Sequence, residues 1–181
     1  EAIAAELGLN VPLMAWHTQR DSLVELANWL SLVTGSLAKM GQDLILLAQT
    51  EVGEILESAD VSRGGSSTMP QKRNPIVSEL MVAAARTNAS LLANMHQAMI
   101  QEHERGTHGW QMEWLALPQM VTLTAAALNK AVFLSGNLVV DSTRMERNVG
   151  DSLGLMLGEA LNFALAEFMD RAAAKELIRE A

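Results

Sequence analysis

Apolar residues recur three or four positions apart along most of the chain, which is the spacing of a helix with one buried face. The longest such pattern runs from about Thr18 to Glu57 and predicts one long helix. Patterns over residues 76–101 and about 111–139 predict a second and a third. The alternation of three and four is typical of a seam between packed helices. The predicted seams are Leu23, Leu26, Leu30, Val33, Leu37, Met40, Leu44 and Leu47; Val77, Met81, Ala84, Asn88, Leu91, Met95 and Ala98; and Leu117, Val121, Thr124, Leu128, Ala131, Ser135 and Leu138.

Two polar or breaking residues interrupt these patterns. Asn88 either fixes the register of the helices or lies exposed through a slight shift of the buried face. Pro118 lies near the start of the third helix, where it marks either a kink or the true first turn.

Shorter helices are predicted near both ends of the chain. Residues 1–8 read as the end of a helix. Asp141 is a suitable cap for a short helix over about 143–149. Residues 155–168 are helical in pattern, and Asp170 caps a last helix. Because no alternation typical of a strand or hairpin occurs, the fold class is predicted to be all-α.

The lengths of these helices predict the architecture. Helices of roughly 25 to 40 residues span about 40–60 Å, more than a compact domain of this size needs. We therefore expect an elongated bundle over residues 1–140 and the beginning of a small helical C-terminal domain over residues 141–181. The broad apolar faces predict a homo-oligomer, most simply with dihedral symmetry. Because the chain starts without methionine, we expect it to be a fragment of a longer protein.

Composition narrows the partners. The net charge of −8 argues against nucleic acid. The absence of cysteine excludes disulfides and thiolate metal sites and is compatible with the cytoplasm, where we expect the protein. Polar residues interrupt every long apolar run, so no membrane partner is expected. We also expect no cofactor.

A polar loop at residues 64–75 separates the first two long helices. Its paired glycines permit positive φ, and a proline at the start of the next helix suits the first turn. Hydroxyls and cations at a helix N-terminus favour an anion site, while a solvated linker is the plainer alternative. The loop matches neither the hydrolase nucleophile elbow nor the P-loop. Its residues are Gly64, Gly65, Ser66, Ser67, Thr68, Met69, Pro70, Gln71, Lys72, Arg73, Asn74 and Pro75.

Two further polar clusters could line a pocket. In residues 101–108 we expect a recognition site at a helix end in which Arg105 faces an anion, and a solvated helix terminus is the plainer alternative. Glu102 and His103 point apart on a helix and lack the His-Glu-x-x-His spacing, so we expect no metal site.

The other cluster, residues 16–21, precedes the first long helix. Its His17 and Arg20 suggest a pocket rim, although Arg20 could simply pair with Asp21, which is worth little when exposed.

The string from Gly65 to Pro75 resembles the signature of the fumarase/aspartase superfamily, Gly-Ser-Ser-x-Met-Pro-x-Lys-x-Asn-Pro. The resemblance implies a central bundle of long helices, a homotetramer and active sites shared between subunits. Residues 16–21, 49–54 and 101–105 are similar to the superfamily's cycloisomerase branch.

The adenylosuccinate lyase branch is the alternative. It resembles this chain at Lys-Arg-Asn-Pro, but it has charged or hydroxyl residues, which hold a phosphate, where this chain has Leu80, Trp110 and Trp114. A phosphate needs such donors, so the cycloisomerase branch is the better match. An alternative of another class, a non-catalytic helical scaffold, would not need Ser66 or Lys72.

The resemblance implies reversible lactone formation during the breakdown of aromatic acids. A carboxylate oxygen adds to a double bond and a proton is delivered to the neighbouring carbon. Cations and amide donors stabilise the charge that develops in such a reaction. The residues implied are Ser66 for proton transfer, Ser67, Thr68, Lys72 and Asn74 for the carboxylates of a small polycarboxylate, and Arg105, His17 and Arg20 for the rest of the anion pocket.

One departure from the superfamily pattern concerns its catalytic histidine segment. That segment lies upstream in the superfamily and is missing here, and His103 does not replace it. We therefore expect the 181-residue chain alone to form helices but to be inactive.

Overall fold

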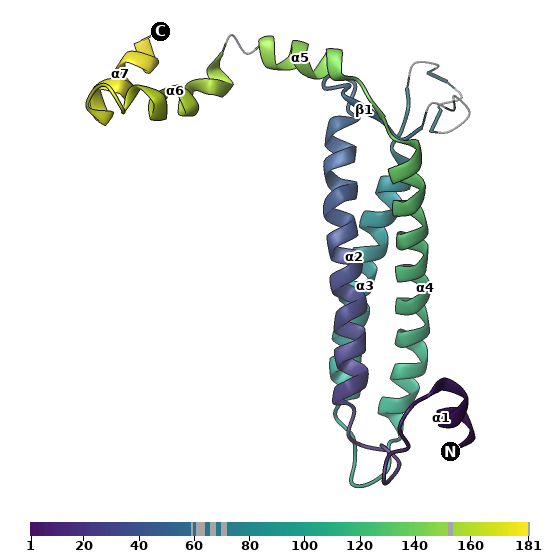
Figure 1. Cartoon of the computed structure of the whole chain (residues 1–181). Coiled ribbons are helices and arrows are strands. Elements are labelled where there is room, and N and C mark those ends of the chain that lie inside the picture. The colour runs from purple at the N-terminus through teal and green to yellow at the C-terminus, as the bar shows by residue number, and fades with distance from the viewer. Residues whose placement is uncertain (59, 61–63, 66–67, 70–71, 152–153, 181) are drawn as a thin grey trace. The chain divides into compact units, whose positions relative to one another are not determined.

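Helices dominate the computed structural model (Figure 1), which confirms the all-α prediction. The chain divides into two compact units, each made of two stretches: Glu1–Ile45 with Pro75–Asn137, and Leu46–Asn74 with Leu138–Ala181. We call them unit 1 and unit 2. The predicted domain boundary at residue 140 stays a prediction. The structure describes residues 1–58, 60, 64–65, 68–69, 72–151 and 154–180.

Unit 1 is a bundle in which three long helices lie side by side (Figure 1). They share one apolar core, to which all three contribute. A short helix, α1, precedes them. The helices are α1 (Ala2–Leu7), α2 (Asp21–Leu47, of which residues 46–47 fall in unit 2), α3 (Ile76–Ala98) and α4 (His108–Asn137), and the buried core residues are Val24, Ala27, Leu30, Met95, Ala116 and Met120.

The predicted seam is correct for α3 and wrong for parts of α2 and α4. In α2, Leu26 is 43% exposed while its neighbour Ala27 is fully buried. Likewise Val121 of α4 is exposed and Met120 is buried. At these two positions the buried face is shifted by one residue from the predicted seam. The backbones of α2 and α3 also approach closely at one point. A Cβ on Gly41 of α2 would lie 3.0 Å from the carbonyl oxygen of Ser78.

Asn88 of α3 is fully buried, so the alternative that places it at the surface is wrong. Its Nδ2 donates to Thr124 Oγ1 at 3.0 Å and to Thr34 Oγ1 at 3.3 Å. These contacts reach α4 and α2 from α3. A polar group that must find both partners favours one register of the three helices.

Pro118 lies inside α4, which begins ten residues earlier at His108. Among the described residues, α4 is the one helix long and apolar enough to cross a membrane by length and composition alone. A core helix of a bundle meets the same criterion.

Unit 2 contains two short strands that the sequence did not predict. β1 (Ile55–Leu56) pairs antiparallel with β2 (Val139–Val140), with Ile55 opposite Val140. The predicted cap is confirmed, since Asp141 Oδ1 accepts a bond from the Arg144 amide at 2.9 Å. The helical elements are α5 (Ser142–Gly150), a 3₁₀ turn (Leu155–Leu157), α6 (Gly158–Leu165) and α7 (Arg171–Glu180).

Helix α2 ends at Leu47, ten residues before the predicted end at Glu57. Side chains of α5 take the carbonyls that follow. Arg144 donates to the carbonyl oxygens of Val52 at 2.9 Å and Glu51 at 2.6 Å. Asn148 Nδ2 also donates to Val52 at 2.9 Å. The carbonyls of the turn between α2 and β1 are thus satisfied by side chains of α5.

Candidate active site

The base of the 64–75 loop is closed by backbone contacts. The Asn74 amide donates to the Gly64 carbonyl at 2.8 Å, and Gly65 forms an isolated antiparallel bridge with Arg73. Gly64 has a φ of 68°, and a Cβ there would clash with the Asn74 carbonyl oxygen. Glycine is therefore required on both conformational and steric grounds.

The described side chains of this loop differ in their exposure to solvent. Thr68 and Lys72 are exposed, and Asn74 is half-buried. Arg73 is also half-buried, and its Nη1 donates to the Ser58 carbonyl at 3.3 Å. The exposed lysine is thus accessible to an anion from solution. Ser66 and Ser67 lie outside the described residues.

The connection between α3 and α4 is tightly packed around Gln101. Its Nε2 donates to the Ala98 carbonyl at 2.7 Å. A Cβ on buried Gly109 would clash with that nitrogen, so only glycine fits. Arg105 is exposed on this connection, and its side chain makes no ion pair with a described residue. Arg105 is therefore accessible from solution, and its predicted role in binding an anion stays a prediction.

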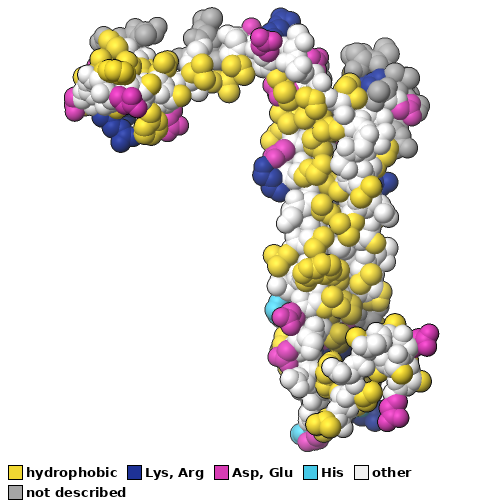
Figure 2. All heavy atoms as spheres, viewed as in Figure 1, with side chains coloured by type: hydrophobic (Ala, Val, Ile, Leu, Met, Phe, Trp, Pro, Cys, Tyr) yellow, Lys and Arg dark blue, Asp and Glu magenta, His cyan; other side chains and the backbone are white. Residues whose placement is uncertain are grey.

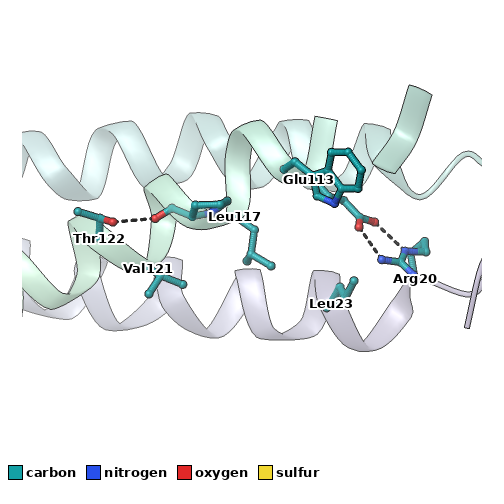
Figure 3. A pocket seen from close by; sticks show the side chains of 8 residues that line it. Arg20, Leu23, Glu113, Leu117, Val121 and Thr122 are labelled. Carbon is teal, nitrogen blue, oxygen red and sulfur yellow. Dashed lines mark hydrogen bonds and ion pairs between the residues drawn. The ribbon is translucent and has the colours of Figure 1, made fainter. Parts of the chain in front are cut away.

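Arg20 is held by Glu113 (Figure 3). Its Nε and Nη2 donate to the two carboxylate oxygens at 2.7 and 2.5 Å. The arginine side chain is 10% exposed and the carboxylate side chain 5% exposed. Arg20 Nη1 also donates to the Trp16 carbonyl at 2.6 Å. The sequence left Asp21 open as a partner for Arg20, but the structure pairs it with a residue of α4.

His17 lies against the same end of α4. Its ring stacks on Trp110 with centroids 5.0 Å apart and planes at 19°. Trp110 Nε1 donates to the His17 carbonyl at 3.2 Å, and the Arg20 guanidinium lies 5.9 Å from the indole centroid. We call His17, Arg20, Trp110 and Glu113 the His17 cluster. Among the described residues no group of acidic or histidine side chains could hold a metal ion.

A groove of about 600 Å³ opens beside this cluster, and Figure 3 shows it between α2 and α4. One end is the Arg20–Glu113 pair, and the rest is largely apolar. The groove therefore offers little polar chemistry beyond the ion pair. Its other lining residues include Leu23, Trp114, Leu117, Pro118 and Val121.

The structure brings some predicted site residues together. His17 and Arg20 meet at one end of unit 1, while Thr68, Lys72 and Asn74 belong to unit 2. Glu113 was not among the predicted site residues. One signal was present: Glu113 lies three and seven residues before the buried Ala116 and Met120, so an acid falls on the buried face of α4.

A family model described as lyase matches residues 1–87. Together with the loop string and the helical bundle, this match confirms the class recognised from the sequence. The match covers just under half of the chain, and it agrees with the resemblance of the loop string to the fumarase/aspartase superfamily.

Particular relatives point to one branch. The chain is 50% identical, over 179 residues, to "3-carboxy-cis,cis-muconate cycloisomerase" of Pseudomonas aeruginosa, covering 99% of this chain and 39% of that protein. The crystal structure of the 3-carboxy-cis,cis-muconate lactonizing enzyme from Pseudomonas putida aligns with a TM-score of 0.86 at 44% identity, covering 99% of this chain and 40% of that one. The cycloisomerase from Acinetobacter calcoaceticus gives 0.84 at 34% identity, with 99% and 38% covered. The chain thus spans about two fifths of the relatives it matches.

Proposed function

We propose that this chain is part of a cycloisomerase that interconverts 3-carboxy-cis,cis-muconate and a carboxymuconolactone in aromatic-acid breakdown. The observation that carries the proposal is the 50% identity to an enzyme of that name along 99% of the chain. The retention of every fixed position of the loop signature supports the same chemistry.

The reaction is an internal addition that needs no other reactant. A carboxylate oxygen forms a bond to one carbon of a double bond, and the electron pair of that bond accepts a proton at the neighbouring carbon. In reverse, a base removes the proton α to a carboxylate, which then carries extra negative charge. Fixed cations and amide donors lower the energy of that state.

The proposed roles follow the superfamily pattern. Ser66 transfers the proton, and the loop residues from Ser67 to Asn74 hold substrate carboxylates. The exposed ammonium of Lys72 supports its part, because a cation at the surface is accessible to an anion. Arg105, which is also exposed, completes the anion pocket together with His17 and Arg20. The assigned loop residues are Ser67, Thr68, Lys72 and Asn74.

We also propose a cytoplasmic homotetramer with active sites shared between subunits. Unit 1 supports this, because large apolar side chains remain exposed on its helices. Trp29 is 56% exposed, Leu115 70% and Val132 71%. Figure 2 shows apolar side chains running along the long helices. Exposed apolar area of this extent is typical of surfaces that other chains cover.

The proposal is tested by assaying the protein in its full natural length with two substrates. We expect turnover of 3-carboxy-cis,cis-muconate and none of adenylosuccinate. The adenylosuccinate lyase alternative predicts the reverse, but Leu80, Trp110 and Trp114 provide no cation for its phosphate. Activity on adenylosuccinate alone would reject the cycloisomerase proposal, and activity on neither would favour a scaffold.

A further inference from the structure

Glu113 is a buried acid to which nothing above gives a function. It lies on the buried face of α4 and is 5% exposed. Its carboxylate is occupied on both oxygens by the guanidinium of Arg20, which comes from the segment before α2 (Figure 3). The pair joins residues 93 positions apart in the sequence.

Stability alone is a poor explanation of this pair. Removing two charges from water costs several kcal/mol, and a well-packed apolar pair of similar volume is often as stable or more so. A bidentate pair does provide geometry, because the planar guanidinium and the carboxylate fix each other's orientation. The useful property of Glu113 is therefore where it places Arg20.

Arg20 transmits this placement to His17. Its remaining nitrogen, Nη1, donates to the carbonyl of Trp16, the residue before His17. Trp110, three residues before Glu113 on α4, bonds the His17 carbonyl and stacks on its ring. The backbone on both sides of the His17 amide is thus tied to α4, and the imidazole rests on an indole.

The clamped ring has a defined donor. His17 Nδ1 is buried and has no hydrogen-bond partner among the described residues. A buried N–H without an acceptor is costly, so the neutral ring carries its proton on Nε2. Nε2–H is then the group that can donate to a carboxylate.

We propose that Glu113 is the positioning residue of the His17 cluster: through Arg20 it fixes the His17 imidazole so that Nε2–H can donate to a substrate carboxylate. This inference rests on the proposed function, because it takes a carboxylate as the anion. Glu113 touches Arg20, not the substrate, and Trp110 is the second support of the same ring.

The direction in which one substitution changes KM tests the inference. Glu113→Gln keeps the size of the side chain and removes a negative charge beside an anion pocket. If Glu113 acted only through its charge, its loss would lower KM for an anionic substrate. Loss of positioning instead raises KM by about tenfold, the effect of losing one charge-assisted hydrogen bond, with kcat little changed. Glu25→Gln is the matched control, because Glu25 is exposed on α2 and makes no ion pair with a described residue.

Trp110→Phe is the second variant, in case an unpaired buried Arg20 prevents folding. It leaves the ion pair intact, retains an aromatic ring for stacking and removes the bond to the His17 carbonyl. We expect KM to rise by less than in Glu113→Gln, again without a comparable fall in kcat. An unchanged or lowered KM in both variants overturns the inference, and so does a fall in kcat alone.

A readout without substrate separates this inference from the proposed function. Diethyl pyrocarbonate modifies accessible, unprotonated imidazoles, and mass spectrometry of the peptide that contains His17 gives the rate. We expect faster modification in Glu113→Gln than in Glu25→Gln, because the ring is released. Equal rates contradict the positioning role even if the enzyme turns over 3-carboxymuconate. If His17 is modified faster in Glu113→Gln but the enzyme does not turn over 3-carboxymuconate, the positioning role is supported and the proposed function is rejected.

Discussion

The His17 cluster and the 64–75 loop are held in opposite ways. In the cluster, side chains hold one another, and the one cation, Arg20, is already neutralised by Glu113. In the loop, the backbone closes the structure through Gly64 and Asn74, and the cation Lys72 stays exposed. The comparison indicates a division of labour. The backbone-held loop leaves the Lys72 ammonium exposed to a substrate, whereas the side-chain network of the cluster fixes one group in place.

The largest effect should come from the loop serine. We expect Ser66→Ala to lower kcat of the full-length protein by about 10²–10⁴-fold, the usual contribution of a proton-transfer group. Circular dichroism should show unchanged helix content, because the described residues of the loop lie outside the helices. Ser90→Ala is the control, since Ser90 is exposed on α3 and its hydroxyl donates to its own helix, at Arg86. Wild-type kcat in Ser66→Ala would remove this serine from the mechanism.

The two neighbouring cations of the loop, Lys72 and Arg73, should contribute unequally to substrate binding. Lys72→Met removes an exposed cation, and we expect KM to rise by about 10- to 100-fold, the value of a charge-assisted bond to the substrate. Arg73→Met removes a cation already engaged with the Ser58 carbonyl, so KM should rise less. Steady-state kinetics of both variants measures the difference. A larger rise in Arg73→Met would show that the exposed ammonium is not the anion ligand.

The backbone closure itself can be broken at Gly64. An alanine there must adopt a φ of 68° against the Asn74 carbonyl, which costs about 1–3 kcal/mol. The Asn74 amide donates to the Gly64 carbonyl, so its hydrogen exchange reports local opening of the loop. We expect the free energy of that opening to fall by the same amount. Gly136→Ala is the matched control: a Cβ on this exposed glycine of α4 would meet no atom within 4 Å, so alanine should stabilise the helix by up to about 1 kcal/mol. If the Asn74 amide exchanged at the same rate in both variants, the backbone bond between Asn74 and Gly64 would not close the loop.

Local sequence signals predicted much of this structure. Helical periodicity located the three long helices, and the cap at Asp141 was correct because capping depends on neighbours a few residues away. The buried stripe of α3 was also predicted. In α2 and α4 the pattern of large apolar residues pointed to the wrong stripe, because positions such as Leu26 and Val121 are exposed and small residues face the core. Periodicity alone does not tell which of two apolar stripes of a helix is buried within the chain.

Long-range polar contacts could not be predicted in the same way. The sequence proposed His17 and Arg20 as site residues, but it predicted neither Glu113 nor its pairing with Arg20 across 93 positions. The contacts of the turn after α2 are of the same kind, since Arg144 lies about ninety residues later in the chain. Periodicity carries no information about such partners. The position of Ser66 lies outside the described residues and stays a prediction.

The turn after α2 is held in the same way as the His17 cluster, since the side chain of Arg144 donates to backbone carbonyls. Arg144→Lys should retain one of its two bonds to the carbonyls of Glu51 and Val52, because an ammonium lacks the fork of a guanidinium. We expect the free energy of local opening of this turn to fall by about 1 kcal/mol.

Hydrogen exchange of the Gly53 amide reports this turn, because that amide donates to the Gln49 carbonyl at 2.7 Å. A cost of about 1 kcal/mol speeds its exchange about fivefold. Arg147→Lys is the matched control on the same helix, where the arginine is 70% exposed and forms a 3.9 Å pair with Asp151; such pairs contribute little. If both variants exchange at the same rate, the turn is held by its own backbone, and it belongs with the 64–75 loop instead of the His17 cluster.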